Sequence, residues 1–315
     1  MNGKFARHIL IVIAALAMVS CMKETIVTRD AISFAPVASK PTKAIIEGTD
    51  YPVDVRFAVS AFYNGSAPYF RNITATKAST YWETASPEYW PLGGSLKFNA
   101  YSPASVSDIT DITIDSDGIS VTDYTIQTTD QMTTDLCYAS ATVPDCANHP
   151  ESVPLVFSHA LSQVVFRVKA AAYYTNTTIS LTSLSLSGIY SVGDLSGGEW
   201  ENQDTEHTYT LSSVSTVLSY SGTTPEVADV CNYLYLPQTF GPNAALRVGY
   251  SITQRVSDTD YTLTNPPVSI PLSGSISQWE PGKKYIYTIN IGMDNINFTA
   301  TANSWNEQQG GVVVE

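Results

Sequence analysis

Apolar and polar residues alternate along most of this 315-residue chain, and that alternation is the feature that most restricts its fold. After residue 20 no window shows sustained apolar spacing at three and four residues, which an amphipathic helix needs. A period of two instead places every second side chain on one face of a strand, as in segments 96–101, 164–169 and 285–291. Each segment has an apolar face and a wetter face, so the sequence predicts an all-β fold of antiparallel sandwiches.

Turn-forming residues separate the predicted strands at short intervals, which is typical of a sandwich. These turns fall at 63–66 (YNGS), 91–94 (PLGG), 115–118 (DSDG), 195–198 (LSGG) and 281–282 (PG).

One strand, in residues 178–189, contains a change of phase. Its apolar residues stand at odd positions first, at Ile179 and Leu181, and at even positions afterwards, at Leu184 and Leu186. Since a one-residue slip moves every later side chain to the other face, one extra residue must be absorbed between them. We therefore expect a β-bulge near residues 182–183.

The first twenty residues carry the features of an export signal. Lys4 and Arg7 precede eleven apolar residues at 9–19, and a small residue stands directly before Cys21. That apolar stretch is too short to cross a bilayer core of roughly 30 Å, so it predicts a cleaved signal peptide. A small residue before a cysteine favours lipoprotein processing with acylation of Cys21 over ordinary secretion. Each buried CH₂ of such an anchor contributes about 0.8 kcal/mol, which makes the attachment stable.

The charge balance excludes one class of partner. Removing residues 1–20 takes away two positive and no negative side chains, so the formal net charge changes from −13 to −15. A chain this acidic does not bind nucleic acid through its phosphates. The acidic coat indicates a soluble surface.

The length predicts two sandwich domains. About 295 residues follow the signal, which is large for one sandwich, and residues 144–154 combine Pro, Asn, His and Asp as a linker does. The predicted division is a signal peptide at 1–20, an N-terminal segment at 21–43, a first sandwich at 44–152 and a second at 153–315.

Cysteine usage indicates that the core, and not a disulfide framework, carries the fold. Beyond Cys21 only Cys137, Cys146 and Cys231 remain, and an odd number cannot pair completely. Cys137 and Cys146 could bridge in an oxidising compartment, or all three could be buried thiols. No Cys or His spacing resembles a zinc site, so no metal and no cofactor are expected.

Several segments in a fixed order resemble the fimbrillin (Mfa-like) family of type V pilus subunits, over nearly the whole chain. Besides Cys21, the resemblance rests on 32–36 (ISFAP), 40–48 (KPTKAIIEG), 54–63 (DVRFAVSAFY), 88–103 (EYWPLGGSLKFNAYSP), 153–168 (VPLVFSHALSQVVFRV), 279–291 (WEPGKKYIYTINI) and the closing Trp305 before 310–315 (GGVVVE).

The resemblance implies a structural subunit of a surface fimbria that supports cell adhesion, and not an enzyme. It implies two tandem transthyretin-like sandwiches and an outer-membrane lipoprotein precursor. The implied partners are other subunits of the same family, a trypsin-like processing protease and the outer membrane through the lipid anchor. The receptor is not specified, and stalk, anchor and tip roles all remain open.

The resemblance also implies that the first mature strand is removable. Ile32, Phe34 and Val37 would fill a groove until a protease cuts after a basic residue. By position that residue is Lys43, where the family more often has Arg. An unpaired sheet edge is a template for another chain, so covering it until assembly makes physical sense.

The C-terminal segment is the expected donor that refills the groove of a neighbouring subunit. Its alternating apolar residues are Ile296, Phe298, Ala300 and Ala302, followed by Val312 and Val314. Strand addition draws its affinity from backbone pairing and its specificity from every second side chain. In the alternative, 296–305 forms the chain's own last strand and only 310–315 is free.

The remaining polar motifs favour structural roles. An acidic run around Asp115 places Thr113 and Tyr124 where a calcium loop needs Asp and Glu, so we expect a hairpin turn there. His159 accompanies no nucleophile motif, so we expect a hydrogen-bonded structural histidine and no catalytic residue.

Two aromatic pairs, Tyr81–Trp82 and Tyr89–Trp90, allow a second hypothesis. Such rings can stack on sugars, which suggests a non-polymerising surface lipoprotein that binds glycans. In sandwiches, however, aromatic rings more often pack in the core or across strands.

Overall fold

The computed structural model describes residues 29–38, 51–105, 111–127, 133–212, 215–274 and 276–305. Nearly all regular structure in these ranges is strand, with two short 3₁₀ turns, η1 (Cys146–Asn148) and η2 (Leu272–Gly274). The all-β prediction is therefore confirmed. None of the described segments forms a helix long and apolar enough to cross a membrane.

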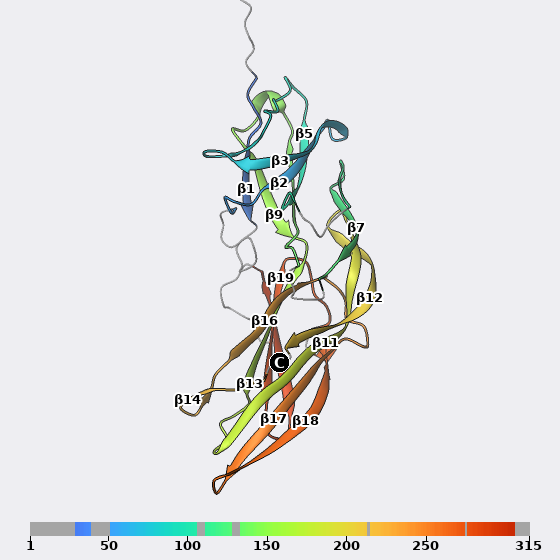
Figure 1. The fold of residues 1–315 in the computed structure, drawn as a ribbon. Helices are drawn as coiled ribbons and strands as arrows, with labels where there is room; N and C mark the ends of the chain where they lie inside the picture. The colour runs from blue at the N-terminus through green and yellow to red at the C-terminus, as the bar shows by residue number, and fades with distance from the viewer. Residues whose placement is uncertain are drawn as a thin grey trace, which may run out of the picture.

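Seven strands form a sheet that closes on itself, at the top of Figure 1. The closure depends on the first strand, which pairs antiparallel with β4 on one side and parallel with β9 on the other. The interior holds one apolar cluster that is rich in phenylalanine. In order around the sheet, the strands are β1 (Phe34–Ala38), β4 (Trp82–Thr84), β3 (Ala67–Lys77), β2 (Phe57–Tyr63), β5 (Leu96–Ser102), β8 (Cys137–Val143) and β9 (Val153–His159).

Two further sheets share a second apolar core. Most of their strands lie in the lower part of Figure 1, although β7 lies higher in the view. The smaller sheet has the order β16 (Ala228–Tyr235), β10 (Ser162–Ala170), β19 (Lys283–Ile291) and β20 (Ile296–Ser304). The larger sheet has the order β18 (Thr259–Pro271), β17 (Ala245–Val256), β11 (Thr177–Ser196), β7 (Ile119–Thr125) and β6 (Ile112–Ile114), and β11 also pairs with β12 (Glu199–Ser212) and β13 (Thr216–Val217). A two-stranded ribbon joins β14 (Tyr220–Ser221) and β15 (Thr224–Pro225).

The boundary predicted near residue 152 does not coincide with a change of sheet. The strand that follows it, β9, pairs with β8 and β1 in the closed sheet. Strands β6 and β7 precede the boundary but lie in the sheet of β11. The stretch predicted as a linker contains η1, whose first turn is capped by the Asp145 side chain. Its polar composition reflects a capped connection between two paired strands.

The predicted bulge in the long strand β11 is confirmed. The register of β11 against β17 shifts between Leu181 and Ser183, and Ser183 stands opposite Gly249. A Cβ on Gly249 would lie 2.3 Å from the Ser183 hydroxyl oxygen and 3.0 Å from that of Thr182, so a larger residue there would require the side chains at the bulge to move.

The acidic run forms a hairpin turn between β6 and β7, as expected. One carboxylate oxygen of Asp115 accepts hydrogen bonds from the backbone N–H groups of Asp117 and Gly118, at 2.8 and 3.1 Å. This is the local turn geometry that aspartate favours.

A glycine in β11 sets a testable requirement of the fold. Gly188 has a φ of +67°, and a Cβ there would lie 2.4 Å from the backbone of Asn243. We expect Gly188→Ala to lower the free energy of unfolding by more than about 2 kcal/mol, because backbone strain adds to a clash with backbone. Gly222→Ala, at φ +63° with open space around it, should cost only about 1 kcal/mol. If urea titrations showed that both variants lose the same free energy of unfolding, the close approach of Gly188 to the backbone of Asn243 would be contradicted.

Candidate functional site: the first strand and its groove

Removal of strand β1 would open the closed sheet, because β1 joins β4 to β9. It pairs with β9 over its whole length, from Phe34 opposite Val153 to Ala38 opposite Phe157, and it meets β4 at Trp82. Without it, the remaining order runs from β4 to β9, and both strands would present unpaired backbone. The strand therefore occupies a slot between two sheet edges.

The side chains of this segment alternate between the core and the surface. Ile32 and Phe34 are 2% and 0% exposed, and Pro36 is also buried. The Phe34 ring meets the rings of Phe57 and Phe98 edge-on, with centroids 5.7 and 5.8 Å apart. The predicted filling of a groove by Ile32 and Phe34 agrees with this geometry.

Val37 does not fill the groove as predicted. Its side chain is 39% exposed, whereas the next residue towards the N-terminus, Pro36, points inward. The period of two that buries Ile32 and Phe34 reaches Pro36 next, so it leaves position 37 outside. The sequence prediction moved three positions from Phe34 to Val37 and so departed from the period of two.

Backbone hydrogen bonds hold the residues just before β1. The N–H of Ile32 donates to the carbonyl oxygen of Glu88 at 2.6 Å, and the N–H of Val153 donates to that of Ser33 at 2.8 Å. The N–H of Trp90 donates to the carbonyl oxygen of Asp30 at 3.1 Å. Such bonds do not depend on side-chain identity, so another strand with the same apolar alternation could form them.

An aromatic floor lies beneath the strand. Tyr51, Phe57 and Phe157 pack against one another, with ring centroids 5.2–5.8 Å apart, and Tyr51 also meets Trp82. All four are buried beside Phe34 in the same cluster. Departure of β1 would expose this floor to water, which is strongly unfavourable.

Four of the predicted site residues lie outside the described ranges. These are Cys21, Lys43 and the valines at 312 and 314, which the sequence predicts as lipidation site, cleavage site and donor residues. The description stops at Ala38 and resumes at Tyr51, so the interval between them contains Lys43.

The upstream part of the predicted donor belongs to the chain's own fold. Ile296, Phe298 and Ala300 lie in β20, which pairs with β19 at nine positions, and they pack on the second core. Ala302 is exposed on the same strand. This arrangement is the alternative that the sequence left open, and it corrects the assignment of these four residues to a free donor strand.

The aromatic pairs do not form an open platform. The side chains of Trp82 and Trp90 are 6% and 3% exposed, and both belong to the core of the closed sheet. Trp90 stacks on the His149 ring, with centroids 4.4 Å apart. Tyr89 is 46% exposed and has no indole beside it at the surface. The two aromatic pairs therefore do not provide the exposed rings on which the glycan-binding hypothesis was based.

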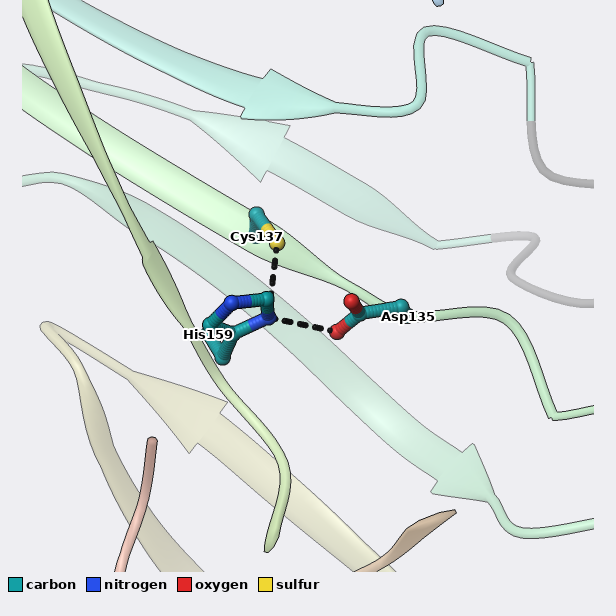
Figure 2. Close-up of side chains that lie close together, drawn as sticks. All are labelled: Asp135, Cys137 and His159. Atoms are coloured by element: carbon teal, nitrogen blue, oxygen red, sulfur yellow. Dashed lines mark hydrogen bonds and ion pairs between the residues drawn. The ribbon is translucent and has the colours of Figure 1, made fainter. Parts of the chain in front are cut away.

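His159 lies in a small buried polar cluster, drawn in Figure 2. Its Nδ1 is 3.0 Å from an Asp135 carboxylate oxygen and 3.4 Å from the Cys137 sulfur. The Trp305 ring stacks on the imidazole, with centroids 4.0 Å apart. The predicted hydrogen-bonded histidine is confirmed. Both polar partners meet the same ring nitrogen, unlike a catalytic triad, where the base uses its two nitrogens separately.

All three cysteines of the described chain are free thiols, so the bridge between Cys137 and Cys146 that the sequence left open is not formed. Burial raises the pKa of the Cys137 thiol well above its usual value, and the Asp135 carboxylate raises it further. Burial likewise raises the pKa of Cys231 to about 12. These thiols are therefore poor nucleophiles.

Sequence reasoning missed that Asp135, Cys137 and His159 come together. Cys137 and His159 are direct partners across the β8–β9 ladder. Twenty-two residues separate them in the chain, so no local motif marks them. Only the strand register could have revealed the pairing.

The packing of β1 leads to a stability prediction. We expect Phe34→Ala to lower the free energy of unfolding by about 3–5 kcal/mol, because a fully buried ring leaves a cavity. Val37→Ala, at a side chain that is 39% exposed, should change it by less than about 1 kcal/mol. Urea unfolding followed by tryptophan fluorescence measures both changes. If Phe34→Ala lowered the free energy of unfolding as little as Val37→Ala, β1 would not fill the groove.

Comparisons with known proteins agree with this architecture. A fimbrillin-like family model matches residues 49–305. A fimbrial protein from Bacteroides vulgatus superposes with a TM-score of 0.64 at 18% identity, over 87% of this chain and 99% of that one. A candidate cell adhesion protein from Bacteroides uniformis gives 0.51 at 17% identity, over 87% and 98%.

At these identities the superpositions establish the fold alone. A search of curated proteins gives no match. The family model covers far more than half of the sequence, and on that ground the chain belongs to the fimbrillin-like family.

Proposed function

We propose that this protein is a structural subunit of a surface fimbria, assembled by exchange of its first strand for a strand of another subunit, and that it supports cell adhesion. The observation that carries the proposal is the position of β1 between β4 and β9. Membership of the fimbrillin-like family, and the fimbrial protein among the similar structures, support a pilus-type subunit at the cell surface.

The energetics favour exchange over simple release. Burying a side chain such as Ile32 or Phe34 contributes about 1.5–3 kcal/mol each, and the paired backbone adds to this. A free groove would also expose the aromatic floor. The first strand therefore leaves at low cost only as an incoming strand replaces its contacts step by step.

Proteolysis in the interval 39–50 would make the exchange irreversible. Lys43 is our proposed cleavage site, because a cut there leaves β1 without a covalent link to the groove. Trypsin-like proteases do not cut before proline, which excludes Lys40, since Pro41 follows it. The proposed enzyme is trypsin-like and accepts lysine.

The proposed donor is the segment after Trp305, with Val312 and Val314 as its groove-filling residues. Trp305 gives this segment a fixed origin, because its side chain is buried and its backbone N–H donates to the carbonyl oxygen of Gly282 at 3.1 Å. Ten residues follow, and an extended chain spans about 3.3–3.6 Å per residue. That length is enough to leave one subunit and replace a five-residue strand in the next.

The lipid anchor and the removable strand would share one segment. We propose that acylated Cys21 holds the precursor in the cell outer membrane, and that residues 21–43 carry both the anchor and β1. One cut after Lys43 then separates the subunit from its lipid and opens its groove. Transthyretin-like architecture for the two halves, divided between β9 and β10 instead of near residue 152, belongs to the same proposal.

Limited trypsin treatment of the full chain in detergent tests the exchange. We expect a first cut after Lys43, release of the fragment that contains Phe34, and ladders of oligomers that resist mild denaturation. Mass spectrometry identifies the cut, and gel electrophoresis without boiling shows the ladders.

Two variants separate cleavage from polymerisation. Lys43→Gln should remain uncut at this position and monomeric. A chain that ends at Trp305 should be cut but should form no ladder, since it lacks the donor. A wild-type chain that stays monomeric after a verified cut and loss of the fragment would disprove the exchange.

A further inference from the structure

We propose that Asp135, Cys137 and His159 bind a divalent transition-metal ion, for which Zn²⁺ is the best match, as a structural site. The candidate ligand atoms of these residues all lie within 4.8 Å of one another. The side chains converge in Figure 2 from β8, from the residues just before it and from the end of β9. The proposal does not depend on the proposed fimbrial function.

The distances suit a tetrahedral ion. Zinc bonds of about 2.0 Å to nitrogen or oxygen and about 2.3 Å to sulfur place neighbouring ligand atoms about 3.3–3.6 Å apart. The observed separations from His159 Nδ1 are 3.4 Å to Cys137 Sγ and 3.0 Å to Asp135 Oδ1. An outward shift of the carboxylate by about 0.3 Å would bring the nitrogen–oxygen separation to the tetrahedral value.

One buried oxygen points to a missing partner. Asp135 is 2% exposed, and its second carboxylate oxygen, Oδ2, has no hydrogen-bond partner. A buried carboxylate oxygen without a partner is costly and calls for an unseen water or ion.

The charges balance with a divalent ion. A thiolate, a carboxylate and a neutral imidazole carry a total charge of −2, which one divalent cation neutralises. The buried site then holds no net charge. Sulfur and nitrogen ligands favour zinc over calcium or magnesium, which prefer oxygen alone.

The surroundings indicate a structural and not a catalytic ion. All three side chains are at most 3% exposed, and Trp305 covers the imidazole face. Only three candidate side chains are present in the described part of the chain, so a water or a backbone carbonyl would supply the fourth ligand. Bound metal would clamp the end of the β8–β9 ladder where the closed sheet meets the second core.

Cobalt substitution gives the sharpest test. The full chain, reduced, treated with chelator and freed of it, is titrated with CoCl₂ alone. We expect one equivalent to bind with a thiolate-to-cobalt charge-transfer band and intense visible bands of tetrahedral Co²⁺. ZnCl₂ should displace these bands and raise Tm by about 5 °C at saturating concentrations.

Single variants assign the ligands. Cys137→Ser should abolish the charge-transfer band. Asp135→Asn should weaken cobalt binding more than about tenfold, because loss of a residue that only hydrogen-bonds to a metal ligand already weakens metal binding by about that factor. Cys146→Ser and Cys231→Ser are matched controls that change a buried or half-buried thiol elsewhere, and they should bind cobalt normally.

A triple variant keeps the test decisive if Cys137→Ser does not fold. Cys21→Ser, Cys146→Ser and Cys231→Ser together leave Cys137 as the only cysteine. A retained charge-transfer band then assigns the ligand to Cys137. Loss of the band in this variant, or a wild-type chain that binds no cobalt stoichiometrically, would overturn the proposal and leave a cluster held by hydrogen bonds alone.

Discussion

The two-sided pairing of β1 is the interaction on which the closed sheet depends. Five residues hold two edges together, through a parallel ladder to β9 and an antiparallel contact with β4. Ile32 and Phe34 fill the interior beneath them. A short strand thus completes a large core, with Phe34 packed edge-on against Phe57 and Phe98.

Much of the fold could be predicted from the sequence, because the information is local. Period-two alternation gave the strands, and the phase change around residues 182–183 located a bulge that strand pairing confirms. Asp115 located a hairpin turn through its own short-range hydrogen bonds. Strand faces and turns of this kind are determined by residues that lie close together in the sequence.

Features that depend on strand pairing could not be predicted in this way. Residues 144–154 have the composition of a linker, yet they join two neighbours in one sheet. Trp82 and Trp90 resemble exposed sugar-binding rings in sequence, but the closed sheet turns both inward. The assembly of Asp135, Cys137 and His159 likewise follows from one register across the β8–β9 ladder.

The parallel direction of β1 beside β9 has a consequence for the shape of any polymer. A replacement strand that keeps these hydrogen bonds must run the same way along β9 as β1 does. The giving and the receiving surfaces are then different, so each contact is heterologous and does not close on itself. Successive subunits would share one orientation, and the resulting fibre would have chemically distinct ends.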